Sequence, residues 1–275
     1  MNTKIIIYDD NCPMCSAYTK AFVKTGFLDE EGRKNFNNVT PELIAKIDLR
    51  KSANEIPVID TASGQVWYGI DAILELLQQK IPYAKAIGNI RLIKWPLIKL
   101  YKFISYNRRV IVASKRKNEI FDCTPSFNTQ YRFLFMAIFL MFNTIMLFPL
   151  REFVLTKSIF ASSAIAQLQA AHALLVFVNI SIAAQLNKRE GFEYLGQINM
   201  LALLVILLTI PLIIVNRYAS SNFSSLNNFY LGAVATFTVQ EYVRRMKFID
   251  FFKTHPAIIL VNVISMISFV CYLIG

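Results

Sequence analysis

Acidic residues are missing from one stretch of this chain, residues 85–118, which holds ten Lys or Arg and no Asp or Glu. Residues 1–84 carry nine basic and eleven acidic side chains, and residues 119–275 carry ten and seven. The net charge of +11 therefore comes almost entirely from the middle stretch. Polybasic stretches are typical of nucleic-acid-binding proteins. This one precedes a long apolar run, where Lys and Arg set topology and contact anionic lipid. We expect a lipid bilayer as partner and no nucleic acid.

Cysteine and histidine are also scarce, with four and two residues in the 275-residue chain. Cysteines at positions 12, 15, 123 and 271 do not make the dense disulfide framework of small secreted domains. The N-terminus has only Lys4 before a short isoleucine run, so we expect no secretory signal peptide. A lone Cys-x-x-Cys supplies two zinc ligands where a structural site needs four, so we expect no bound metal.

Apolar residues are abundant, at 55% of the chain, and the mean hydropathy of +0.43 is too high for an ordinary soluble protein. They gather after residue 130 in runs long enough to cross ~30 Å of hydrocarbon. One run, 226–243, is short and holds Thr, Gln and Glu. We therefore expect an all-α transmembrane bundle of four or five helices over residues 131–275. The predicted spans are 131–150, 161–186, 194–216, 226–243 and 256–274.

The charges of the short loops predict an orientation for this bundle. The loops near 187–193 and 244–255 hold six Lys or Arg between them, and they lie on the same side as the basic stretch 85–118. The opposite loops hold three, at Arg151, Lys157 and Arg217. The larger number of Lys and Arg on the side of the N-terminal part predicts that this part lies on the cytoplasmic side of the cell membrane.

The chain opens on an isoleucine run, residues 5–7, followed by Tyr8, acids and two cysteines three positions apart. This order predicts a buried strand, a tight turn, and a helix that begins at Cys12. Free N–H groups and the dipole at a helix start lower the pKa of a thiol there. Because residues three apart share a helix face, Cys15 can reach Cys12. The spacing predicts thiol–disulfide exchange, with Cys12 as attacking thiolate and Cys15 as resolving thiol.

The rest of residues 1–84 predicts a compact α/β domain. We expect strands over 4–8, 43–49, 56–60 and 65–68, and helices over 12–26 and 70–80. The order β-α-β-β-β-α is that of a compressed thioredoxin-like fold, beside which a Cys-x-x-Cys is the expected redox motif. Pro57 opens the third strand, where thioredoxin-like folds carry a cis-proline facing the cysteines. A trans-proline at the first residue of a strand is equally allowed.

Three motifs resemble the DCC family of predicted thiol–disulfide oxidoreductases. They are Tyr8-Asp9-x-x-Cys12-Pro13-x-Cys15, the segment 67–73 (Trp-Tyr-Gly-Ile-Asp-Ala-Ile), and the segment 101–108, which ends in Asn-Arg. Together they cover roughly residues 3–112. The resemblance implies redox activity but names no substrate. Asp10 stands where the family usually has Gly, and Asp tolerates left-handed backbone geometry better than most residues.

The residues around the cysteines have more than one reading. Asp9 either shuttles a proton or caps the turn. A second carboxylate at Asp10 opposes thiolate formation. We group Asp10 with Pro13 and Pro57 as supporting residues of the site.

Two residues outside the motif are further candidates. Cys123 could receive a disulfide from Cys12–Cys15, or it is a small buried thiol in a connecting loop. His172 falls near the centre of the second predicted span, where an ionisable group indicates a quinone or proton site. An interhelical hydrogen bond from its neutral ring is the alternative.

Residues 85–130 form a basic, amphipathic connector. After Pro96 the apolar and basic residues recur at helical spacing on different faces. This helix either completes the soluble domain by packing on its sheet or lies in the lipid interface.

These patterns predict a membrane-anchored thiol–disulfide oxidoreductase of the protein-disulfide reductase type. A disulfide-containing protein or small molecule is the expected substrate, and no cofactor is expected. The alternatives are a quinone-coupled disulfide enzyme that passes electrons into the bundle, and a transporter or scaffold whose redox domain only senses.

Overall fold

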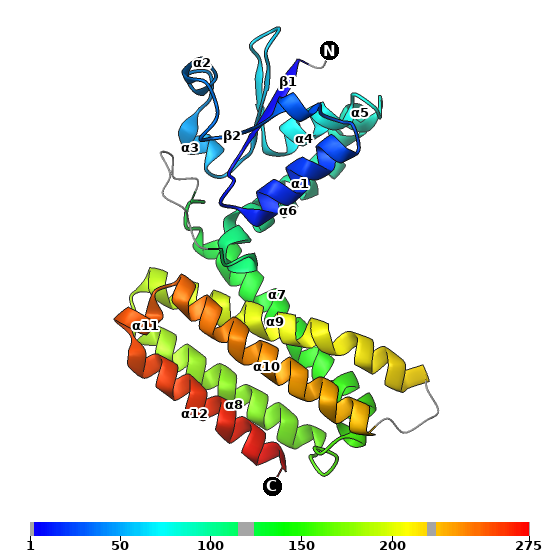
Figure 1. Ribbon diagram of the computed structural model, residues 1–275, viewed down its shortest axis with the longest axis vertical. Coiled ribbons are helices and arrows are strands. Elements are labelled where there is room, and N and C mark those ends of the chain that lie inside the picture. Colours follow the sequence, from blue (N-terminus) through cyan, green and yellow to red (C-terminus); the bar gives the residue numbers. More distant parts are fainter. Residues whose placement is uncertain (1–2, 115–123, 219–223, 275) are drawn as a thin grey trace. The chain divides into compact units, whose positions relative to one another are not determined.

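The computed structural model describes residues 3–114, 124–218 and 224–274. The chain divides into two compact units, residues 1–131 and 132–275. The first is a small mixed sheet with helices, and the second is almost wholly helical (Figure 1).

The sheet of the first unit has four strands in the order β2-β1-β3-β4. Their bounds are β1 Lys4–Tyr8, β2 Arg33–Asn35, β3 Pro57–Asp60 and β4 Val66–Tyr68. β1 pairs in parallel with β2 and antiparallel with β3, and β3 and β4 form a hairpin. A parallel pair needs a crossover helix, and α1 (Pro13–Lys24) supplies it. This is the predicted thioredoxin-like arrangement.

Five further helices belong to this unit. They are α2 Pro41–Ile44, α3 Leu49–Ser52, α4 Gly69–Leu77, α5 Ala84–Gly88 and α6 Arg91–Ile111, and a 3-10 turn over Glu30–Gly32 leads into β2.

The prediction of a strand over residues 43–49 was wrong. The segment belongs to α2 and the turn that follows, and the second strand is the polar stretch Arg33–Asn35, predicted as loop. Pro41 at the first helical position favours a helix start, and Leu43, Ile44 and Ile47 meet one core cluster at helical spacing. β2 lies at the edge of the sheet, where a short strand needs no apolar alternation.

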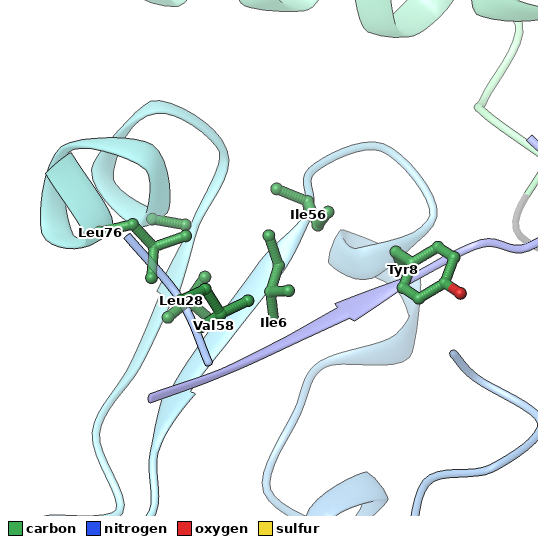
Figure 2. Close-up of a cluster of buried hydrophobic side chains, with 7 residues drawn as sticks. Ile6, Tyr8, Leu28, Ile56, Val58 and Leu76 are labelled. Atoms are coloured by element: carbon green, nitrogen blue, oxygen red, sulfur yellow. The ribbon is translucent and has the colours of Figure 1, made fainter. Parts of the chain in front are cut away.

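The isoleucine run of β1 is continuous because both faces of the sheet are covered. Ile6 packs on one face with Leu28, Val58 and Leu76 (Figure 2). Ile7 packs on the other face in a cluster with Phe36, Val39, Ile47 and Ile59. Alternate residues of a strand point to opposite faces, so neighbouring isoleucines serve two different cores. Both are fully buried, which holds the end of β1, and the turn that follows it, in place.

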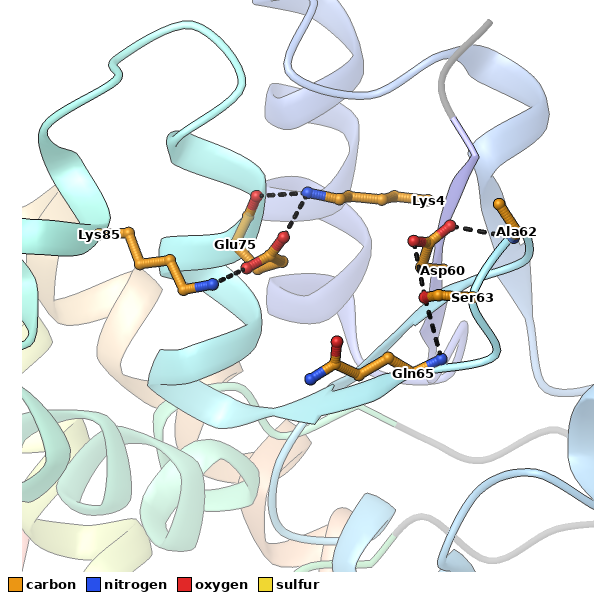
Figure 3. Close-up of polar contacts among 7 residues, drawn as sticks. All are labelled: Lys4, Asp60, Ala62, Ser63, Gln65, Glu75 and Lys85. Carbon is orange, nitrogen blue, oxygen red and sulfur yellow. Dashed lines mark hydrogen bonds and ion pairs between the residues drawn. The ribbon is translucent and has the colours of Figure 1, made fainter.

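Glu75 of α4 ties the strand layer to the helices. One oxygen of its buried carboxylate accepts from the Lys4 ammonium and the other from that of Lys85, both at 2.6 Å (Figure 3). Burial raises the pKa of Glu75, but the hydrogen bonds and charges of the two lysines outweigh it and hold that pKa below its ordinary value. Figure 3 also shows the Asp60–Ser63 contact (2.8 Å) in the turn of the β3–β4 hairpin.

We expect Glu75→Gln to destabilise the first unit by about 3 kcal/mol, because it leaves the half-buried ammonium of Lys4 without its counter-charge. The lowered pKa means that the carboxylate contributes stability above its ordinary pKa, and the contribution disappears as the pH falls through the folded value. Chemical unfolding of this unit at pH 7 and at pH 3 measures both effects. An equal loss at the two pH values would contradict this account.

The second unit is built from long antiparallel and parallel helices. Their bounds are α7 Thr129–Phe153, α8 Ile165–Ala184, α9 Lys188–Tyr218, α10 Ser224–Phe248, α11 Phe251–Thr254 and α12 Pro256–Ile274, with a 3-10 turn over Leu155–Lys157. Four of the described helices, α7, α8, α9 and α12, are long and apolar enough to cross a membrane. The fourth predicted span, 226–243, lies within α10, which is not among the four. Four candidate spans among the described residues agree with the predicted bundle of four or five helices.

Buried polar contacts join the helices of this unit. The Tyr194 hydroxyl donates to the Asn179 amide oxygen and accepts from the Asn262 amide nitrogen at 2.8 Å, which links α9 to α8 and α12. Asn262 also contacts the Tyr242 hydroxyl of α10 at 3.0 Å. In an apolar medium each such polar group needs a hydrogen-bond partner, so the network fixes how α8, α9, α10 and α12 pack against one another.

Three charged residues of α10, Glu241, Arg244 and Arg245, are also paired. The Arg245 guanidinium, 1% exposed, donates to Glu241 and to the Gln197 amide oxygen of α9, both at 2.7 Å. Arg244 donates to both carboxylate oxygens of Glu241. These contacts explain why a helix with this many charges belongs to an otherwise apolar bundle.

Candidate functional site

Cys12 and Cys15 lie at the junction between the end of β1 and the start of α1, as predicted. Cys12 is the N-cap of α1, Pro13 is its first residue, and Cys15 lies in its first turn. The Cys15 backbone N–H donates to the Cys12 sulfur at 3.2 Å, and the Cys12 N–H donates to the Asp9 carbonyl at 3.3 Å. Both thiols are free and buried, at 8% and 5% exposure. A Cys Sγ thus takes the capping role that usually belongs to Ser, Thr or Asp.

The two thiols have opposite acid strengths. The pKa of Cys12 is lowered to about 7, chiefly because the Cys15 thiol donates a hydrogen bond to it; burial acts in the other direction. The charge of Arg108 and the Cys15 N–H lower the Cys12 pKa further. The pKa of Cys15 is raised far above its ordinary range, because its proton is held in that hydrogen bond and burial disfavours a second anion. Near neutral pH the pair therefore carries at most one negative charge, and that charge is on Cys12.

Arg108 supplies the positive charge of the site. Its Nη2 donates to the Ala53 carbonyl at 3.0 Å and lies 3.9 Å from the Asp9 carboxylate oxygen Oδ2. The residue is 9% exposed, so little water screens its charge. Burial would lower the Arg108 pKa, but the thiols and Asp9 raise it, so the guanidinium remains charged. Sequence reasoning placed Arg108 in a motif but assigned it no role.

The spacing of the third motif has a structural explanation. Tyr101, Ser105 and Arg108 recur along one face of α6 and all contact the loop before β3. The Tyr101 hydroxyl accepts from the Ile56 N–H at 2.9 Å, and the Ser105 hydroxyl donates to the Asn54 carbonyl. α6 thus holds the segment that leads into Pro57.

The second motif meets the same loop. The Gly69 N–H donates to the Ile56 carbonyl at 3.0 Å. Gly69 has a φ of +58°, and an added Cβ would lie 3.3 Å from the Glu55 carboxylate and 3.4 Å from the Tyr101 ring. Only glycine suits that backbone and that space. The loop before Pro57 is therefore where two of the motifs converge.

The two carboxylates of the turn have different surroundings. Asp9 Oδ1 accepts from the Asn11 N–H at 3.0 Å, which is the contact of a turn-capping residue, while Oδ2 faces Arg108. Asp10 is exposed and accepts from the Asn35 and Asn37 amides at 3.3 and 3.4 Å. Asp10 therefore joins the turn to β2 and to the residues after it.

Pro57 is buried at the first residue of β3, and no cis peptide bond occurs in the described ranges, so its bond to Ile56 is trans. Of the two readings of Pro57, the structure has the trans-proline at a strand start.

The remaining candidates lie on other segments of the chain. Cys123 lies outside the described residues. Cys271 is an exposed thiol on α12. His172 is half-buried on α8, and the hydrogen bonds that join this helix to α9 and α12 involve Asn179 and Gln167. Within residues 3–114, 124–218 and 224–274, no three His, Cys, Asp or Glu side chains come together as metal ligands would.

Residues 6–113 match the family model of DCC1-like thiol-disulfide oxidoreductase. The match spans the cysteine pair, the loop before Pro57 and all of α6, so it covers all three motifs and confirms the resemblance found in the sequence. No curated protein and no solved structure matches the chain.

Proposed function

We propose that this protein is a membrane-anchored thiol–disulfide oxidoreductase that reduces disulfides of proteins or small molecules through Cys12 and Cys15. The observation that carries the proposal is the split in acid strength of the pair: the Cys12 pKa is lowered to about 7 while Cys15 keeps its proton. A thiolate is the nucleophile of disulfide exchange, and attack is most effective when the thiol pKa lies near the ambient pH. The family match of residues 6–113 supports the same activity.

The proposed reaction has two displacements. The Cys12 thiolate attacks one sulfur of the substrate disulfide, that S–S bond breaks, and the first substrate thiolate leaves. Cys15, once the Cys12 charge is lost to the mixed disulfide, gives its proton to the leaving thiolate or to Asp9. The Cys15 thiolate then attacks the Cys12 sulfur, the bond between Cys12 and the substrate breaks, the Cys12–Cys15 disulfide forms, and the second substrate sulfur leaves as a thiolate. The substrate gains two electrons, and a dithiol donor must return them to the enzyme.

Four other residues would support these steps. Arg108 favours the thiolate at Cys12. Pro13 begins α1 without an N–H to satisfy. Asp10 fixes the turn through its two asparagine contacts, and Pro57 begins the strand next to β1.

Trapping with Cys15→Ser tests the proposal. Without the resolving thiol, the mixed disulfide between Cys12 and its substrate has no intramolecular route to collapse and should accumulate. The full chain, expressed in its membrane and quenched with acid and alkylating agent, should show adducts that a reductant removes. Cys271→Ser is the matched control, because it removes an exposed thiol of the second unit and keeps both cysteines of the pair. Equal adduct levels in Cys15→Ser and in the Cys12→Ser, Cys15→Ser double variant would refute the proposal.

We also propose that the redox domain faces the cytoplasm, as the loop charges favour. A membrane-impermeant thiol reagent applied to intact cells should then leave Cys12 unlabelled, and it should label Cys12 after the cells are opened. Labelling of Cys12 at equal rates in intact and opened cells would reverse the orientation. In a reducing cytosol the pair would be kept mostly as the dithiol, which suits a disulfide reductase.

A further inference from the structure

Apolar side chains are exposed along one continuous stretch of the first unit, from residue 81 to residue 104. Among the described residues before 81, Leu49 is the one exposed large apolar side chain. Six in the stretch are more than half exposed: Tyr83, Ile87, Ile90, Leu92, Trp95 and Leu100. Single exposed apolar residues are ordinary, but a contiguous group marks an interaction surface. We name these six residues the α5–α6 surface.

The part of this surface that belongs to α6 lies on the outer side of that helix. Leu92, Trp95 and Lys99 are spaced three and four residues apart, so they share one face, and all three are exposed. Tyr101 and Arg108 point the other way, into the contacts with the loop before β3. α6 therefore packs on its own domain with one side and leaves an apolar side unpaired with that domain. The reading in which this helix completes the soluble domain holds for the packed face, and the lipid-interface reading stays a prediction for the other face.

The charges that α5 and α6 themselves carry are all positive. Arg91 and Lys99 are exposed beside Leu92 and Trp95, and the Lys99 ammonium lies 5.9 Å from the centre of the Trp95 ring. No acid occurs between residues 85 and 118. The nearest acids of α4 are engaged, Asp71 with Lys94 and Glu75 with Lys4 and Lys85. An apolar face edged by cations is complementary to an anionic bilayer surface.

The chain also keeps this surface close to a bilayer. α6 ends at Ile111 and α7, a candidate membrane span, begins at Thr129. The intervening residues 112–128 reach roughly 60 Å at most, even fully extended. A surface tethered within that reach meets the bilayer at a high effective concentration.

We propose that the α5–α6 surface docks onto the anionic lipid of the membrane that holds the bundle. Apolar side chains such as Leu92 and Trp95 enter the boundary between headgroups and acyl chains, while Arg91 and Lys99 contact anionic headgroups. Docking fixes the face that the domain turns to the membrane, and with it the side from which a disulfide reaches Cys12. The proposal rests on the membrane anchoring above, not on the redox chemistry.

Tryptophan fluorescence of the full chain tests this docking directly. The chain has two tryptophans, so Trp67→Phe leaves Trp95 as the reporter, and Trp95→Phe leaves the half-buried Trp67 as the control. The proteins are reconstituted into vesicles of phosphatidylcholine with phosphatidylglycerol, with and without bromine on the acyl chains. We expect Trp95 emission to be blue-shifted and mostly quenched by brominated lipid, and Trp67 emission to be unaffected.

Charge reversal supplies the second arm of the test. Arg91→Glu with Lys99→Glu should return most of the Trp95 emission, as should high salt or pure phosphatidylcholine vesicles. Lys20→Glu with Lys24→Glu on α1 makes the same change in net charge on other exposed residues and should leave the quenching intact. Trp95 emission that is blue-shifted but insensitive to brominated lipid would show that protein covers the surface. Trp95 emission at long wavelength that iodide quenches would show that the surface is exposed to water. Either result overturns the proposal, and neither bears on disulfide exchange.

Discussion

Cys12→Ser is expected to lower the rate of disulfide exchange at least about a thousandfold, since a serine hydroxyl is not ionised near pH 7 and cannot attack sulfur. The assay is a single turnover with an aromatic disulfide whose released thiolate absorbs light, so no electron donor is needed. A background of Cys123→Ser with Cys271→Ser removes the other two thiols. In that background the reduced pair should release two thiolates per protein, and the Cys12→Ser variant almost none.

Cys15→Ser distinguishes the two roles in the same assay. It should release one thiolate and stop at the mixed disulfide, because the first displacement needs only Cys12. If Cys12→Ser released one thiolate and Cys15→Ser none, the roles of nucleophile and resolving thiol would be exchanged.

Arg108→Met is expected to raise the pKa of Cys12 from about 7 towards the free-cysteine value of about 8.5. A positive charge favours the thiolate, so its removal makes the proton harder to lose. At pH 7 the thiolate fraction, and with it the alkylation rate of Cys12, should fall several-fold, whereas at pH 9.5 the rates should converge. The pH profile of Cys12 alkylation measures this shift.

The same variant should also destabilise the first unit, by about 3 kcal/mol, because it removes the charge that faces the partly buried Asp9 carboxylate and the donor to the Ala53 carbonyl. Arg108→Lys keeps a charge near the thiols, so it should retain most of the lowered pKa while losing part of the stability. Arg91→Met is the matched control at an exposed position on the same helix. It should change neither the pKa of Cys12 nor the stability of the first unit. If a folded Arg108→Met protein kept the same pH profile of Cys12 alkylation, Arg108 would not be a cause of the lowered Cys12 pKa.

Local signals predicted most of the first unit. The run at residues 5–7, the turn residues at 61–64 and the apolar spacing of 70–80 each indicate their element without reference to the rest of the chain. β2 could not be predicted, because Arg33-Lys34-Asn35 has neither apolar content nor alternation. It is a strand because β1 offers an unpaired edge, and that is a property of the assembled sheet.

The site was also predicted only in part. Cys12 and Cys15 follow from their spacing, but the role of Arg108 does not, since 93 residues separate it from Cys15. Its effect depends on α6 crossing back to the loop at 53–56, which only the tertiary structure shows. The pattern that could have indicated this is the spacing of Tyr101, Ser105 and Arg108, which places three polar groups on one face of an otherwise amphipathic helix. In the bundle, Asn179 was likewise less conspicuous in the sequence than His172.

The central claim is that Cys12 and Cys15 interconvert between dithiol and disulfide as one two-electron pair. Equilibration of the full chain in glutathione buffers of stepped potential, followed by acid quenching and mass-shift alkylation, tests this most directly. Both thiols should disappear together in a single transition that follows a two-electron Nernst curve, with Cys271 still alkylated at the midpoint. If Cys12 and Cys15 are lost at different potentials, or each only as a glutathione adduct, the pair is not a dithiol–disulfide centre and the account fails.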